Sequence, residues 1–243
     1  MTRESALPVV DEARGRALPT QLDVPAVAAP WPLVVFAHGW MGHPRRFRRL
    51  FDRWTAAGYA VAAPTFPNTN EASSGQEMDD VQHQAADVRL VLDSLLADDR
   101  FDPARVAVAG FSLGAQTALD VAFETKKRDA RLAAAVAISG ALSPFCSRYE
   151  FGPLPLLVVH GTSDPVVEYA HGSDVYRRAQ RPKALLTVLT GGHDIAQDEP
   201  ATAADATVAE VTTAFLDVAL RGVTVPRPRV DPTVARLESE GIW

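Results

Sequence analysis

The sequence predicts an α/β fold in which a mostly parallel sheet carries helices on both faces and an antiparallel hairpin at its N-terminus. Short apolar runs alternate with amphipathic segments along most of the chain, which is typical of strands linked by helices. The length of 243 residues suits one large domain with a substantial core. A glycine-framed serine follows the apolar run 105–109, at the point where a strand gives way to a helix.

The N-terminal hairpin is expected within residues 8–25. Val9 and Val10 precede a polar turn at 11–16, and residues 17–24 form the returning strand. Pro19 suits an edge strand because it has no N–H to donate to a neighbour.

Six further apolar runs are the length of buried strands, as found in parallel sheets with both faces covered: 33–37, 59–64, 105–109, 132–138, 154–160 and 184–189. Helices are expected between them wherever apolar residues recur at helical spacing: from Phe47 to a stop at Gly58, over 81–97, over 116–124, around Val175 and over 203–220. Asp102-Pro103 is expected to break the chain before the strand at 105–109.

We expect a single domain over residues 1–243, with a core at 8–222 and a C-terminal tail at 223–243. The tail is rich in proline at first and then offers a short helix over 233–240. Only about 15 residues join the strands that end near Ile138 and start near Leu154, so no large cap domain is expected.

Composition limits the partners and the compartment. The formal net charge of −6 disfavours nucleic acid or an anionic membrane, and the cluster Arg45-Arg46, Arg48-Arg49 is more typical of a solvated helix face. There is no leader-like N-terminus and no run of transmembrane length. Cys146 is the single cysteine, which excludes an intrachain disulfide. Together these features favour the cytoplasm, and we interpret Cys146 as an inert loop thiol.

The stretch Gly110-Phe111-Ser112-Leu113-Gly114 predicts a nucleophile elbow. A strand, a tight turn and a helix place the serine at the apex, while the two glycines leave room where a Cβ would clash. The helix N-terminus directs backbone N–H groups toward developing negative charge. We therefore expect Ser112 to be a catalytic nucleophile.

Asp164 and His193 are the expected acid and base, because each follows the end of a predicted strand, in the order Ser, Asp, His. His193 can take the serine proton near neutral pH, and Asp164 would hold its imidazole in one tautomer. Other roles stay open: His193 as a loop residue, Asp164 as a helix N-cap, and Asp194 as a rival acid. His38 and His160 also end strands and are expected to hydrogen-bond loops.

The backbone N–H groups of Trp40 and Leu113 are the candidates for an oxyanion hole. Met41, Phe66 and Phe145 are expected to line an apolar substrate pocket, with core packing as the alternative. No His, Cys, Asp or Glu cluster has metal-ligand spacing, so neither a metal nor a cofactor is expected.

These motifs resemble the α/β-hydrolase superfamily over about residues 8–222. The narrower resemblance is to the dienelactone-hydrolase-like, chlorophyllase-like and platelet-activating-factor-acetylhydrolase-like group, on His38-Gly39-Trp40-Met41-Gly42, the elbow, His160-Gly161-Thr162-Ser163-Asp164-Pro165-Val166-Val167 and Gly191-Gly192-His193. Phe111 and Ala115 depart from residues frequent in such esterases. A serine nucleophile also differs from the cysteine of typical dienelactone hydrolases.

The resemblance and the motifs together predict a serine esterase that cleaves small to medium carboxylic esters through an acyl-enzyme. One alternative keeps the triad and changes the chemistry to a thioesterase, amidase or acyltransferase. A second alternative is a non-catalytic binding protein with a hydrolase fold. The expected partner is a small-molecule ester, and an open site covered only by loops would admit many of them.

Overall fold

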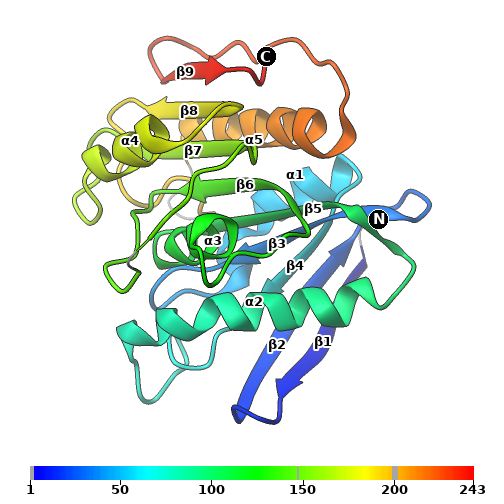
Figure 1. Cartoon of the computed structure of the whole chain (residues 1–243). Helices are drawn as coiled ribbons and strands as arrows, with labels where there is room; N and C mark the ends of the chain where they lie inside the picture. The colour runs from blue at the N-terminus through cyan, green and yellow to red at the C-terminus, as the bar shows by residue number, and fades with distance from the viewer. Residues whose placement is uncertain (1–2, 147, 199–201) are drawn as a thin grey trace.

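The computed structural model describes residues 3–146, 148–198 and 202–243. Its strands are β1 (Arg3–Asp11), β2 (Arg16–Val24), β3 (Trp31–Ala37), β4 (Ala60–Pro64), β5 (Phe101–Phe111), β6 (Leu132–Ile138), β7 (Leu156–Gly161), β8 (Lys183–Val188) and β9 (Ala235–Glu240). They form one nine-stranded sheet in the order β1-β2-β4-β3-β5-β6-β7-β8-β9 (Figure 1). The sheet is therefore continuous from the N-terminal hairpin to the last strand.

The middle of the sheet is parallel and its two ends are antiparallel. Strands β4, β3, β5, β6, β7 and β8 run in the same direction, whereas β1 pairs with β2, β2 with β4, and β8 with β9 in opposite directions. The predicted mostly parallel sheet and its N-terminal antiparallel hairpin are confirmed. All the loops that follow the parallel strands consequently leave the same edge of the sheet.

Helices cover both faces of this sheet (Figure 1). The α-helices are α1 (Arg48–Ala56), α2 (Val81–Leu96), α3 (Leu113–Phe123), α4 (Tyr169–Arg178) and α5 (Ala203–Arg221), with short 3₁₀ turns η1 (Pro44–Phe47) and η2 (Met78–Asp80). Helices α2, α3 and α4 pack in one apolar cluster, and α1 and α5 pack in the other. The sheet is thus the middle layer of three.

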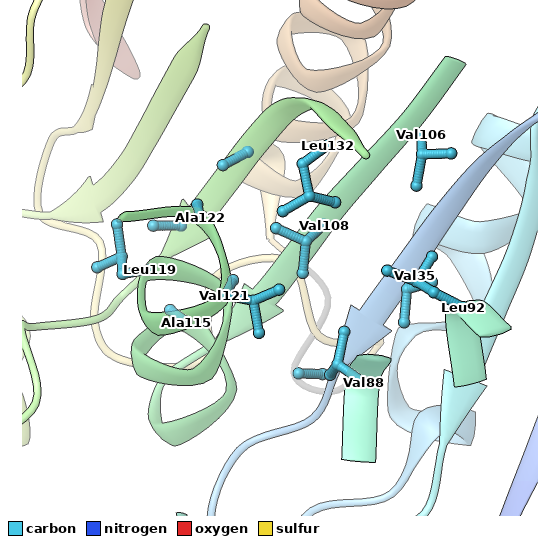
Figure 2. Close-up of a cluster of buried hydrophobic side chains, with 14 of the residues drawn as sticks. Val35, Val88, Leu92, Val106, Val108, Ala115, Leu119, Val121, Ala122 and Leu132 are labelled. Carbon is cyan, nitrogen blue, oxygen red and sulfur yellow. The ribbon is translucent and has the colours of Figure 1, made fainter. Parts of the chain in front are cut away.

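Alternation along the strands divides the core between these two clusters. Along β3, Val35 faces the cluster with α2 and α3, while Val34 and Phe36 face the cluster with α1 and α5. Figure 2 shows part of the first cluster, in which side chains of β3, β5 and β6 meet those of α2 and α3. Because both faces are covered, the central strands are apolar on both sides, as their sequences predict.

Two expectations about elements are wrong. Residues 235–240, within the expected helix 233–240, form β9, because the free edge of β8 supplies hydrogen-bonding partners and Ala235 and Leu237 are buried against the sheet's helical layer. Asp102-Pro103 was expected to precede the strand, but it lies within it, because β5 begins at Phe101. Residues 102–105 form an irregularity in the pairing with β3, between the pairs Trp31↔Phe101 and Leu33↔Val106.

The loop between β6 and β7 bears on the access to the site. Its described residues, 139–146 and 148–155, contain no helix.

Among the described helices, none has both the length and the apolarity needed to cross a membrane.

Candidate active site

Ser112 lies at the apex of the turn between β5 and α3, in a strained backbone conformation. Its φ is 54° and its ψ is −118°, a region that a residue with a Cβ rarely occupies. Its own N–H donates to the carbonyl of Ile138 at 2.8 Å, which holds the turn onto the neighbouring strand β6. The tight turn presents the serine side chain above the carboxyl ends of the strands.

Gly110 and Gly114 make this turn possible by allowing two close backbone approaches. A Cβ on Gly110 would lie 2.0 Å from the carbonyl oxygen of Gly114, and a Cβ on Gly114 would lie 2.0 Å from that of Ala37. No side chain fits at either position. The glycines of the motif therefore bring α3 directly against β5 and β3.

Three side chains form a continuous hydrogen-bonded chain at this edge of the sheet. His193 Nε2 lies 2.9 Å from Ser112 Oγ, and His193 Nδ1 lies 2.8 Å from Asp164 Oδ2. A carboxylate only accepts, so Nδ1 carries the proton and Nε2 is free to accept from the serine. The structure thus brings together the three residues that the sequence singled out on separate strands.

Asp164 is positioned by its own loop. Its side chain is fully buried, and its Oδ1 accepts from the N–H groups of Val166 at 2.8 Å and Val167 at 2.9 Å. This leaves Oδ2 directed at His193. Asp164 therefore holds the turn 164–167 and is also the partner of the imidazole. The alternative of a helix N-cap is wrong, because α4 begins at Tyr169 and Glu168 is at its N-cap position.

The loops that carry the acid and the base are tied to each other. The Ser163 N–H donates to the Gly191 carbonyl at 2.9 Å, and the Thr190 N–H donates to Thr162 Oγ1 at 2.9 Å. The His193 ring also packs against the Phe111 ring, with centroids 5.0 Å apart. Asp194, the rival acid, instead accepts from the side chain of Gln197 at 2.8 Å.

Trp40 and Leu113 supply two free backbone donors beside Ser112. Among the described residues neither N–H donates a hydrogen bond within the protein. Trp40 is the second residue of a turn in which the Gly42 N–H donates to the Gly39 carbonyl at 3.0 Å, and Leu113 begins α3. Their role as an oxyanion hole stays a prediction.

His38 fixes the loop that carries Trp40. Its Nδ1 donates to the Gly39 carbonyl at 2.8 Å, and its Nε2 accepts from the Phe66 N–H at 3.1 Å. Complete burial lowers the pKa of His38 to about 4, so the ring is neutral and suited to donate at one nitrogen and accept at the other. The expectation that His38 bonds loops is confirmed.

A cavity of about 200 Å³ opens at Ser112 and His193. Trp40, predicted as a backbone donor, lines this cavity. Most of its other walls come from residues that the sequence analysis did not propose for the pocket: Arg46, Phe47, Phe111, Val166 and Gln197. Of these, Phe111 and Val166 stand within the two quoted motifs, so their positions beside Ser112 and Asp164 were the available signal. Phe47 is the last residue of η1 and lies at the site because this turn packs against β3, where the Phe47 and Phe36 ring centroids are 4.6 Å apart.

The three expected pocket residues lie elsewhere. Phe66 is fully buried in the core against His38, with ring centroids 5.1 Å apart, so the pocket role expected for it is wrong and the core alternative holds. Met41 and Phe145 are about half exposed, at 45% and 49%, and neither borders the cavity at Ser112. They belong to the loops around the site rather than to its walls.

A larger cavity, of about 810 Å³, lies between α4 and the described residues 142–146 and 148–151. None of the triad residues lines it, so size alone does not identify the reactive site. Cys146 borders this cavity. Burial raises the pKa of its thiol, and the neighbouring Asp120 carboxylate adds to this effect. A raised thiol pKa disfavours the thiolate, which agrees with an inert cysteine.

Comparison with known proteins places the chain among hydrolases. A family model described as chlorophyllase matches residues 6–142, which include the Trp40 loop and Ser112. The ferulic acid esterase from Streptomyces cinnamoneus superposes with a TM-score of 0.73 at 22% identity, covering 95% of this chain and 92% of that one. An esterase domain from Rhodothermus marinus gives 0.64 at 19% identity, covering 88% and 97%. Identities this low show the fold alone, which is the α/β-hydrolase fold.

Sequence relatives cover less of their own length. NocK of Nocardia uniformis subsp. tsuyamanensis, provisionally assigned as an esterase, is 32% identical over 165 residues, which are 65% of this chain and 47% of NocK. The human α/β hydrolase domain-containing protein 17B is 42% identical over 40 residues, or 16% of this chain and 14% of that protein. The chain therefore spans less than half the length of these relatives.

Proposed function

The chain belongs to the chlorophyllase family, and on that premise we propose that it is a serine esterase that hydrolyses carboxylic esters through an acyl-enzyme. The observation that carries this proposal is the unbroken chain from Ser112 through His193 to Asp164, with links of 2.9 and 2.8 Å. Those distances are within the range at which a base takes a proton from a nucleophile.

The first half of the reaction forms the acyl-enzyme. Ser112 Oγ attacks the ester carbonyl carbon while its proton passes to His193 Nε2, and Asp164 stabilises the imidazolium through Nδ1–H. The carbonyl oxygen becomes an oxyanion between the N–H groups of Trp40 and Leu113. When the tetrahedral intermediate collapses, the C–O bond to the alcohol breaks and His193 returns its proton to the leaving oxygen.

The second half regenerates the enzyme. Water attacks the acyl carbon and gives its proton to His193 Nε2, and a second tetrahedral intermediate forms in the same hole. The bond to Ser112 Oγ then breaks, the serine regains the proton and the carboxylic acid leaves. Every proton transfer in this reaction passes through His193 Nε2.

The cavity supports small to medium groups on the substrate. Its volume of about 200 Å³ is below the common range of roughly 300–1,000 Å³ for drug-sized ligands, and Phe47, Phe111 and Trp40 line it. We expect short acyl chains to fit best. Longer or bulkier alcohols would extend over the loops around Met41 and Val166, which are 45% and 68% exposed.

The test is a chain-length series of p-nitrophenyl esters with the wild type, Ser112→Ala and a matched Ser74→Ala control. Ser74 is exposed in the loop after β4, so its hydroxyl loss should leave turnover unchanged. We expect Ser112→Ala to lose at least about a thousandfold in kcat/KM. We expect the wild type to prefer short acyl groups and to give a burst of p-nitrophenol.

The same acyl group presented as an oxygen ester, a thioester and an anilide separates the alternative chemistries. An esterase turns over the oxygen ester fastest. Full activity of Ser112→Ala would remove Ser112 from the mechanism. No turnover of any activated ester by the wild type would favour the non-catalytic alternative.

A further inference from the structure

His160 is a buried histidine that the proposed reaction does not use. It lies in β7, four residues before Asp164, and its side chain has no exposed surface. Its Nε2 lies 2.8 Å from the Val167 carbonyl oxygen and 3.4 Å from Asp164 Oδ2. Both neighbours are acceptors, so Nε2 carries a proton and donates it.

The other nitrogen of His160 has no partner. Nδ1 is buried and, within the described residues, makes no hydrogen bond. With the proton on Nε2, this nitrogen is the bare acceptor of a neutral imidazole. Burial, the largest cause, lowers the pKa of His160 and keeps the ring in this neutral form. His160 thus directs its one N–H at the turn that carries Asp164, while its other nitrogen has no hydrogen-bond partner among the described residues.

Gly172 of α4 holds the ring in this orientation. A Cβ on Gly172 would lie 2.3 Å from His160 Nδ1 and 2.9 Å from its Cγ, so only glycine lets the helix approach this closely. Tyr169, one turn earlier, meets the ring edge to face with centroids 6.0 Å apart. Glycine inside a helix is intrinsically unfavourable, and the contact with His160 accounts for its presence at this position.

The hydrogen bonds of His160 and Asp164 converge on one residue. The Val167 carbonyl accepts a hydrogen bond from His160 Nε2–H. The N–H groups of Val167 and Val166 donate to Asp164 Oδ1. The turn 164–167 is therefore held at its far end by His160 and at its near end by the carboxylate. If the far end were released, Asp164 would lose the two donors that keep Oδ2 directed at His193.

We propose that His160, clamped by Gly172, is a positioning residue that fixes the catalytic acid Asp164 through the turn 164–167. This inference rests on the proposed triad and deepens it. His160 does not touch the substrate. It acts by keeping Asp164 Oδ2 at the 2.8 Å separation from His193 Nδ1 that orients the base.

Substitutions at His160 separate a donor from a packing role. His160→Gln keeps an N–H donor near the position of Nε2, whereas His160→Phe keeps the ring and removes the donor. We expect His160→Phe to lose about tenfold to a hundredfold in kcat with KM changed less than twofold, because orientation is lost and substrate contacts are not. We expect His160→Gln to recover most of that loss. If His160 only filled space, His160→Phe would keep a higher kcat than His160→Gln.

Gly172→Ala tests the clamp from the opposite side. Alanine is the better helix former, so the substitution would stabilise α4 if the glycine had no contact to serve. We expect instead a lower kcat with unchanged KM, because the new Cβ displaces the imidazole. Gly152→Ala is the matched control, since a Cβ there meets nothing within 4 Å. In a His160→Ala background, Gly172→Ala should cost nothing further.

The closing experiment measures the rate at which a fluorophosphonate labels Ser112, alongside ester turnover, in the folded variants. Labelling reports the activation of the nucleophile independently of which ester the enzyme prefers. If the wild type is not labelled, the proposed function and this inference both fail. If the wild type is labelled and folded His160→Phe is labelled equally fast, the inference alone is overturned, as it is if His160→Gln is no better than His160→Phe.

Discussion

Single residues at the site show two unusual backbone features, a strained conformation and N–H groups without a partner in the described protein. Ser112 holds a positive φ of 54°, and the N–H groups of Trp40 and Leu113 have no partner within the described protein. The strained backbone of Ser112 costs stability, and such strain is found where the surrounding structure holds it in place. At this scale the reactive atoms are prepared before a substrate arrives.

The contribution of the Trp40 N–H can be tested with proline. Trp40 is the second residue of its turn, a position that proline favours, so Trp40→Pro removes the donor with the turn preserved. We expect kcat to fall about 10²–10³-fold, the usual effect of losing one oxyanion donor. Trp40→Ala keeps the N–H and is the control in the same ester assay. Equal losses in both variants would assign the effect to the indole ring.

His38 makes the stability of the protein depend on pH. Its pKa is about 4 in the folded chain, against 6.5 for the free side chain, because burial disfavours the charged ring. Between these values the unfolded chain binds a proton that the folded chain does not. The titration of His38 therefore lowers the free energy of unfolding as the pH drops from 6.5 toward 4, and it has no such effect above pH 6.5.

Urea unfolding at several pH values measures this dependence. We expect His38 to contribute a slope of up to about 1.4 kcal/mol per pH unit inside that window. In His38→Asn the overall stability should be lower and the slope between pH 4 and 6.5 shallower. An unchanged slope would assign the acid sensitivity to other groups.

At the scale of elements, distant segments are fastened to one another by single carboxylates. Asp198 lies in the loop between β8 and α5 that also carries His193, and its carboxylate accepts from the backbone N–H groups of Arg48 and Arg49 at 2.9 Å each, at the start of α1. Its own N–H donates to the Arg46 carbonyl at 2.7 Å. One residue thus caps a helix and anchors the loop of the base.

Asp198→Ala should therefore affect stability and activity together. We expect a loss of about 1 kcal/mol in the free energy of unfolding, the usual cost of a missing helix cap, and a lower kcat because the His193 loop is released. Asp198→Asn keeps one acceptor oxygen and should lie between the wild type and Asp198→Ala. Thermal melts and ester turnover on the same preparations check both effects. Wild-type kcat in a destabilised Asp198→Ala would contradict the anchoring role.

For the whole molecule, the direction of the strands decides where the site forms. The parallel strands β3, β5, β7 and β8 end at one edge, and the Trp40 loop, Ser112, Asp164 and His193 follow them in turn. The antiparallel strands β1, β2 and β9 lie outside this group and complete the two ends of the sheet. The outer strands support the site without contributing to its chemistry.

The last strand can be tested as a structural element. Leu237 is 7% exposed and packs in the core cluster of α1 and α5, so Leu237→Ala should lower the free energy of unfolding by about 2 kcal/mol. Its neighbour Glu238 is exposed, and Glu238→Ala should change it by less than about 0.5 kcal/mol. Urea unfolding of both variants makes the comparison. Equal stability of the two would contradict a structural role for β9.

The sequence by itself determined the α/β fold and selected the residues of the hydrogen-bonded chain. Both follow from local patterns: apolar runs specify buried strands, glycines specify the elbow, and the order Ser, Asp, His follows the order of strand ends. Only the tertiary structure decided that residues 235–240 form a strand, because the partner that stabilises it is β8, far away in the sequence. It also placed Phe66 in the core and Phe47 at the cavity, since burial depends on which elements fold over a residue and not on the residue's own neighbours.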